Sequence, residues 1–296
     1  MANRRVLIKR RKAVRNIRKI TRTMQLIATA RFQAAFTRAI ATKPYSEKLA
    51  ELVADLSKAA EGVDHPLMHA AEGIGRSAMV IITSNRGLCG GYNSNVLRTA
   101  VEHLDRAKET GLDTEVHMVG KKGISYFKFL GREMVERITH IDDAPKFEQI
   151  EPIANYLMGQ FVRGEIASVH VAYMKFISTG RQQPEIMQLL PLAQDEQADA
   201  DEASTGGGEA ETQYEFSPEP KQLLEELLPA TVRTQLFQCF TDATVSEQIA
   251  RMVAMKAATD AAEDMITTLT RQYNRARQTQ ITMELLDIVG GANALT

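Results

Sequence analysis

The sequence contains no tryptophan, and aromatic residues make up only 6% of its 296 positions. Proteins that bind single-stranded nucleic acid by base stacking depend on such side chains, so little stacking surface exists here. Cys89 and Cys239 lie far apart and match neither a disulfide framework nor a metal-ligand spacing, which favours a reducing compartment. No stretch approaches the roughly twenty apolar residues of a membrane span, and the basic N-terminus lacks the apolar core of a secretory signal.

Glycine and proline are missing from long stretches at both ends of the chain. Sixty residues between Pro229 and Gly290 contain neither, and the first 61 residues contain no glycine and one proline, Pro44. Because these residue types interrupt helices most strongly, both ends are predicted to form long helices. A continuous C-terminal helix would be roughly 90 Å long. It is therefore expected to pack against another long helix or inside a larger assembly.

Apolar residues recur at helical spacing in both stretches. We expect Pro44 to kink or end the first helix, with the pattern resuming at Leu49. Two such helices can pair antiparallel if the middle of the chain returns one to the other, which predicts a two-stranded coiled coil around a central domain. The predicted stripes are Ala13, Ile17, Ile20, Met24, Ile27, Arg31 and Ala34, and then Val245, Ile249, Met252, Met255, Ala262, Ile266, Leu269, Tyr273 and Ala276.

Short apolar runs alternate with helical patterns in the middle of the chain. This alternation predicts an α/β fold, with a mainly parallel sheet that carries helices on both faces, joined to the long antiparallel coiled coil. The expected strands are 78–83, 115–119, 133–139, 168–174 and 185–190, and the expected helices are 93–109, 121–130 and 147–163. The predicted parts are an N-terminal coiled-coil helix (1–60), a central α/β domain (76–193), an acidic mobile loop (194–220) and a C-terminal helical segment completing the coiled coil (221–296).

Charge is distributed unevenly although the net charge is only −1. Residues 1–43 hold thirteen Lys or Arg and no acid, whereas residues 194–219 hold nine acids and no base. An excess of this size indicates an acidic partner for the first helix. Nucleic-acid phosphates and an acidic protein collar both fit, and composition alone does not separate them. A coiled-coil nucleic-acid-binding protein is therefore one candidate function.

Two glycine motifs raise the question of a nucleotide site. Gly73-Ile-Gly75 matches a dinucleotide-binding pattern in its letters, but it precedes a strand instead of joining a strand to a helix. Gly87-Leu-Cys-Gly90-Gly91 does follow a strand, yet it lacks the Lys and hydroxyl residue of a phosphate loop. A tight turn is the favoured interpretation, and a nucleotide enzyme using this loop is the alternative.

Other catalytic or metal-binding patterns are weak. His65 and His69 lie four apart, but Pro66 stands between them and no carboxylates cluster nearby. No hydrolase elbow or zinc-protease motif occurs. We expect no cofactor, no metal and no catalysis by this chain itself.

Three separated motifs together resemble the gamma subunit of F-type ATP synthases. The C-terminal motif comprises EQIARMVAMKAATD (247–260), YNRARQ (273–278) and ITMEL (281–285). The N-terminal motif comprises IKRR (8–11), IRKITRTM (17–24) and ATAR (28–31), and the central motif is TSNRGLCGGYN (83–93). Their order covers both ends and the middle of the chain.

This resemblance implies a rotor shaft. In that family the paired terminal helices stand inside a hexamer of alternating alpha and beta subunits, and the α/β domain lies at their foot. The shaft transmits torque from a proton-driven membrane c-ring, and nucleotide chemistry belongs to the surrounding subunits. The implied partners are the alpha and beta subunits, the epsilon subunit and the c-ring, with no nucleic acid. The implied location is the cytoplasmic face of a bacterial inner membrane, reached only through the complex.

The resemblance also implies contacts with a beta subunit. Met24 matches a shaft position near an acidic beta loop, and coiled-coil packing is the other interpretation of this residue. The Cys89 loop would face the same moving region from the lower domain. The implied beta-subunit contacts are Arg277, Gln278, Thr282, Glu284, Met24, Arg251 and Cys89.

Overall fold

The structure, a computed structural model, describes residues 4–59, 65–69, 73–192 and 220–293. The chain divides into two compact units, the first made of Met1–Ala30 and Ala250–Thr296 and the second of Arg31–Ile249. The predicted acidic loop at 194–220 lies outside the described residues, apart from Pro220. The two units are called unit 1 and unit 2 below.

Two long helices contribute to both units. α1 (Arg4–Ala59) contains Pro44, and α6 (Pro220–Asn293) contains Pro229. Of the two predicted effects of Pro44, a kink or the end of the helix, the second does not occur, because α1 continues through it. Pro44 is exposed, so water can hydrate the backbone carbonyl whose hydrogen bond the proline removes. Pro220 begins α6, a position where a missing N–H costs nothing.

Within unit 1 the two helices run antiparallel, as expected. The Arg18 guanidinium lies 2.9 Å from the Glu263 carboxylate, and the hydroxyl groups of Thr21 and Thr259 lie 2.8 Å apart. Residues later in α1 therefore contact residues earlier in α6, as antiparallel helices require. The buried apolar cluster of this unit consists of Leu7, Val14, Ala262 and Leu269, with Ile266, Tyr273 and Ala276 packed against it.

The buried face of α1 differs from the predicted stripe. Most of its buried residues recur every seventh position, whereas Ile17, Ile20 and Ile27 are 52%, 59% and 48% exposed. The prediction failed because it placed the largest aliphatic residues in the seam, which is instead built mainly from smaller side chains. On α6 the predicted residues are all buried or half-buried. The buried heptad positions of α1 are Leu7, Val14, Thr21, Ala28, Ala35, Leu49 and Leu56.

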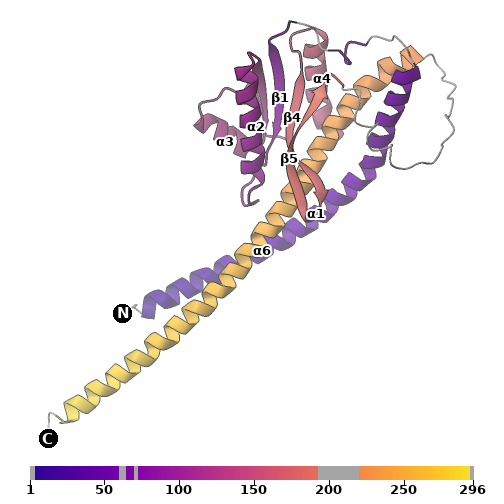
Figure 1. The fold of residues 1–296 in the computed structure, drawn as a ribbon. Helices are drawn as coiled ribbons and strands as arrows, with labels where there is room; N and C mark the ends of the chain where they lie inside the picture. The colour runs from indigo at the N-terminus through magenta and orange to yellow at the C-terminus, as the bar shows by residue number, and fades with distance from the viewer. Residues whose placement is uncertain (1–3, 60–64, 70–72, 193–219, 294–296) are drawn as a thin grey trace, which may run out of the picture. The chain divides into compact units, whose positions relative to one another are not determined.

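Unit 2 contains a five-stranded sheet in the order β3-β2-β1-β4-β5 (Figure 1). Strands β1 to β4 are parallel, and β5 forms an antiparallel hairpin with β4. The mainly parallel sheet is therefore confirmed. The strands are β1 (Arg76–Ile82), β2 (Asp113–Val119), β3 (Glu136–Ile138), β4 (Val169–Ser178) and β5 (Arg181–Leu190), and the intervening helices are α2 (Tyr92–Glu109), α3 (Lys121–Phe129) and α4 (Phe147–Val162).

Helices cover both faces of this sheet, as Figure 1 shows for α2 and α3 on one face and α4 on the other. The α4 face also receives the N-terminal part of α6, whose Leu224, Leu228 and Leu236 belong to the main core. Farther along, α1 and α6 share a second cluster that includes Ala35, Ala39, Val245 and Ile249. The edge of the Phe36 ring meets the Phe176 ring of β4, with centroids 5.6 Å apart.

Candidate functional site

The loop at 83–93 joins β1 to α2 and folds back on itself. Backbone Ser84 N donates to Asn93 Oδ1 (3.0 Å), and the Ser84 hydroxyl donates to the Arg86 carbonyl (2.6 Å). Asn93 Nδ2 donates to the Cys89 thiol sulfur (3.2 Å), which is buried. Leu88 has a φ of 65° and is 59% exposed. The loop thus uses its own polar groups at the start of α2, in agreement with the tight-turn interpretation.

The same loop caps the N-terminus of α3. The amides of Lys121, Lys122 and Gly123 donate to Asn85 Oδ1, the Ser84 carbonyl and Thr83 Oγ1, at 3.0–3.2 Å. These are amides that a helix cannot satisfy internally and that elsewhere can bind anions. Here oxygen atoms of the 83–93 loop accept the hydrogen bonds from these amides.

Glycine at position 120 makes this cap possible. Gly120 has a φ of +92°, and a Cβ there would collide with the carbonyl of Thr83. The Gly120 amide donates to the Ile138 carbonyl (2.9 Å), at the end of β3. The close approach of three chain segments therefore depends on the absence of a side chain.

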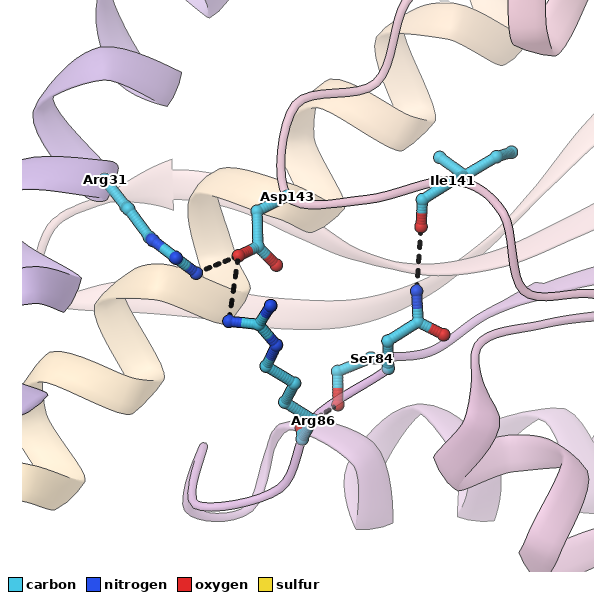
Figure 2. A network of polar contacts seen from close by, with 6 residues as sticks. Arg31, Ser84, Arg86, Ile141 and Asp143 are labelled. Carbon is cyan, nitrogen blue, oxygen red and sulfur yellow. Dashed lines mark hydrogen bonds and ion pairs between the residues drawn. The ribbon is translucent and has the colours of Figure 1, made fainter.

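The loop also reaches α1 through a polar network (Figure 2). Asn85 Nδ2 donates to the Ile141 carbonyl at 2.8 Å. Arg31 of α1 donates from Nη1 to Asp143 Oδ2, and Arg86 Nη1 lies 4.0 Å from the same oxygen. Figure 2 shows both guanidinium groups directed at the Asp143 carboxylate. Two cations from distant parts of the chain thus share one carboxylate.

Asp143 is not among the site residues predicted from the sequence. The available signal was weak: two acids precede Pro145 in a connection that follows a predicted strand. Because the carboxyl ends of parallel strands meet at one edge of a sheet, this connection could have been placed beside the 83–93 loop. The pairing with Arg31 has no comparable local signal, since the two residues are 112 positions apart.

A second group of titratable residues lies where α6 packs on β4 and β5. Burial raises the pKa of Asp242 to about 6, although Gln238 Nε2 donates to its carboxylate (2.9 Å). Burial also raises the pKa of the Cys239 thiol far above its usual range. A protonated thiol is a poor nucleophile, so Cys239 is suited to packing and not to covalent chemistry.

The predicted contact residues near the end of α6 are all exposed. Arg277, Gln278, Thr282 and Glu284 lie on neighbouring turns, where the Thr282 hydroxyl donates to the Gln278 carbonyl (3.0 Å) and Gln280 Nε2 donates to Glu284 Oε1 (2.8 Å). The structure therefore brings these four residues together on one accessible stretch of helix.

The other predicted contacts are less accessible. Met24 is half-buried, Arg251 is 6% exposed and Cys89 is 2% exposed. At the Cys89 loop, the neighbouring Leu88 side chain is far more accessible than the thiol.

The basic half of α1 is largely exposed, but part of it packs on an aromatic ring. The guanidinium carbons of Arg4 and Arg11 lie 5.9 and 5.0 Å from the ring centroid of Tyr273. These cation–π contacts hold the start of α1 against α6 in unit 1. Lys9, Arg10 and Lys12 of this segment are exposed as well.

The described part of the chain shows neither a metal cluster nor a membrane-spanning helix. It contains no group of three or more His, Cys, Asp or Glu residues that could hold a metal ion. None of its helices is long and apolar enough to cross a membrane. His65, considered above as a possible ligand, accepts a hydrogen bond from the Leu67 amide at Nδ1 (3.1 Å) within a turn.

Comparisons with known proteins agree over the whole chain. Residues 3–295 match the family model described as ATP synthase. The chain is 46% identical over 297 residues to an ATP synthase gamma chain from Rhodopirellula baltica, covering 100% of this chain and 99% of that protein. It is 42% identical over 296 residues to one from Leptospira biflexa, covering 100% of both.

Solved structures with a similar fold come from mitochondrial ATP synthases. A chain from the Euglena gracilis OSCP/F1/c-ring structure gives a TM-score of 0.66 at 18% identity, covering 99% of this chain and 94% of that one. A chain from the Tetrahymena thermophila central stalk/c-ring structure gives 0.58 at 22% identity, covering 81% and 99%. At these identities the likeness concerns the fold.

Proposed function

Because this chain belongs to the ATP synthase gamma chain family, we propose that it is the central rotor shaft of a proton-translocating F-type ATP synthase. In this role it transmits torque between the membrane c-ring and the alpha/beta hexamer, and so couples proton flow to ATP synthesis or hydrolysis. Epsilon is its further partner in the rotor. The motifs at both ends and in the middle of the chain support this role.

The observation that carries the proposal is the outward face of unit 1. Small and polar residues fill much of the α1 seam, whereas Ile17, Ile20 and Ile27 are exposed together with most of the basic side chains. Three exposed isoleucines on one helix indicate that the surface of another protein covers them. Positive charge on the same helix would be attracted by an acidic collar over long range and with tolerance for rotation.

We further propose that the chain does no nucleotide chemistry itself. The 83–93 loop supports this view, because its polar groups are engaged in its own turn and in the cap of α3. The catalytic sites would then lie in the surrounding subunits, whose affinities change as the shaft turns. A fold that resembles nucleotide-binding domains does not by itself imply a nucleotide.

The proposed contacts with a beta subunit are Arg277, Gln278, Thr282 and Glu284, with Met24, Arg251 and the Cys89 loop as further candidates. The first four are exposed and include a cation and an anion, which suits charge-assisted contacts that form and break during rotation. The chain is proposed to work at the cytoplasmic face of a bacterial inner membrane, as a peripheral component held there by the complex.

Co-purification tests the proposed function. A tagged chain expressed in its native host is expected to recover alpha and beta subunits from detergent-solubilised membranes. Recovery of the chain without these subunits would overturn the proposal. The nucleic-acid alternative predicts instead that the chain binds duplex DNA or RNA with a steep dependence on salt. The comparisons give that alternative no support.

A further inference from the structure

We infer that Asp143 is a positioning residue that fixes the rotational setting of α1 within unit 2, and so locks the shaft helix to the α/β domain. The inference rests on the proposed function, because only a rotating shaft gives this setting a mechanical consequence. Asp143 lies outside the surfaces proposed above to contact partner subunits.

Arg31 is the first residue of unit 2 along the chain, so it marks the point where α1 joins the unit that contains the sheet. Its guanidinium donates to the Asp143 carboxylate, in the connection between β3 and α4. The pair therefore joins α1 to the connection between β3 and α4 within unit 2.

α1 also makes apolar contacts in this region. Ala35 and Ala39 pack with Val245 and Ile249 of α6, and Phe36 packs edge-on against Phe176 of β4. Close packing of this kind limits the rotation of α1 about its own axis, and a directional contact constrains that rotation further. A charge-assisted hydrogen bond is directional and adds that constraint.

Asp143 can serve as an anchor because the segment before it is held at two points. Asn85 Nδ2 donates to the Ile141 carbonyl, and the Gly120 amide donates to the Ile138 carbonyl. Asn85 in turn accepts a hydrogen bond from the Lys121 amide (3.2 Å), at the start of α3. A continuous series of polar contacts thus leads from α1 through Asp143 to the ends of β1, β2 and β3.

Arg86 contributes a second cation to the same carboxylate oxygen (Figure 2). Its guanidinium lies 4.0 Å from the oxygen that Arg31 contacts, and the Asp143 side chain is 25% exposed against 64% for Arg86. Two cations on one carboxylate restrict its rotamers more than one cation would, because each favours the orientation that also serves the other. The carboxylate therefore presents a fixed acceptor to α1.

The test uses the assembled ATP synthase in inverted membrane vesicles. Asp143→Asn and Arg31→Gln are each expected to lower the number of protons pumped per ATP hydrolysed by about twofold or more, while the amount of assembled complex stays constant. The double variant should be no worse than either single variant, because both remove the same contact. Asp143→Glu keeps the carboxylate and should restore most of the coupling.

Glu165→Gln is the matched control. It removes an exposed ion pair with Arg163, whose Nε lies 2.7 Å from the Glu165 carboxylate, but this pair joins residues only two positions apart. The coupling ratio of this variant should equal that of the parent. If Asp143→Asn assembles fully and pumps like the parent, the lock is refuted while the proposed function stands. If no variant or parent chain assembles with alpha and beta subunits, the proposed function itself fails.

A distance measurement tests the lock independently of turnover. Spin labels on cysteines introduced at the exposed positions Thr37 of α1 and Glu148 of α4 report the setting of α1 within unit 2. The native cysteines are buried and should label poorly. In the full-length chain, Asp143→Asn should broaden the distance distribution and Asp143→Glu should not. Identical distributions in the parent and Asp143→Asn would overturn the inference.

Discussion

At the scale of single residues, Asp242 combines burial with charge. Its pKa rises from 3.8 to about 6, so the folded state binds a proton more tightly than the unfolded state does. The unfavourable effect of ionised Asp242 on the stability of the folded state is absent at acidic pH, where the carboxyl is protonated in both the folded and the unfolded state. It develops as pH rises from about 4 to about 6 and stays constant above that range. Ionised Asp242 therefore lowers the free energy of unfolding at neutral pH.

Asp242→Asn should consequently stabilise the chain at pH 7 by about 1–2 kcal/mol. The amide cannot ionise and keeps a carbonyl that can accept from Gln238. At pH 4 the gain should largely disappear, because the parent carboxyl is then protonated in the folded state. Urea unfolding of both proteins at the two pH values checks this. An equal stability difference at pH 4 and pH 7 would show that ionisation is not the cause.

Gly120 is a second residue whose effect can be predicted from local geometry. A methyl group at this position would meet the Thr83 carbonyl, and the φ of +92° already disfavours any side chain. Gly120→Ala should therefore lower the free energy of unfolding by about 2–4 kcal/mol. Thermal or urea unfolding measures this loss.

Gly131→Ala is the matched control for Gly120→Ala. Gly131 also has a positive φ, +67°, but a Cβ there would meet no atom within 4 Å. Its substitution should cost only the left-handed backbone penalty, about 1–2 kcal/mol. Equal losses at the two positions would mean that the contact with Thr83 does not matter.

At the scale of elements, the buried stripe of α6 was predicted correctly from the sequence, whereas the buried stripe of α1 was not. The α6 stripe was correct because large residues such as Leu269 mark its seam. The α1 stripe was wrong because Ala28 and Thr21 fill the seam while the isoleucines face outward. Hydrophobic periodicity identifies an apolar face, but it cannot distinguish a face that packs within the chain from one that packs against another protein.

This difference predicts contrasting effects of two truncations. Leu269→Ala removes a side chain that is 8% exposed in the unit 1 seam and should cost about 2–4 kcal/mol in the isolated chain. Ile20→Ala removes one that is 59% exposed and should change stability by less than about 0.5 kcal/mol. Helix unfolding followed by circular dichroism measures both values. A larger loss for Ile20→Ala would show that Ile20 packs in the seam between the helices, as the sequence pattern predicted.

The α/β elements were predicted more completely than the contacts between them. Alternating strand and helix patterns located every strand of the sheet, since burial on both faces produces continuous apolar runs such as β1. The Asn85, Asp143 and Arg31 network could not be obtained in that way. Its partners are distant in sequence, and their polar side chains carry no periodic signal.

At the scale of the whole molecule, the exposed end of α6 has a testable role. Arg277→Ala combined with Gln278→Ala should lower ATP hydrolysis or synthesis by the assembled complex severalfold, because contacts that form during rotation would be lost. The isolated chain should keep its stability, since both side chains are exposed. Activity assays on membranes, together with unfolding of the purified chain, separate these effects. Unchanged turnover would remove both residues from the proposed contact surface.

The central claim is that this chain turns inside a catalytic hexamer. Single-molecule rotation tests it most directly, with alpha and beta subunits fixed to a surface and a bead attached to a cysteine introduced at Glu109. That position is exposed at the end of α2, and both native cysteines are buried, so attachment should be specific. We predict unidirectional rotation of the bead that depends on ATP. Sustained ATP hydrolysis by complexes whose attached bead does not rotate would contradict the account.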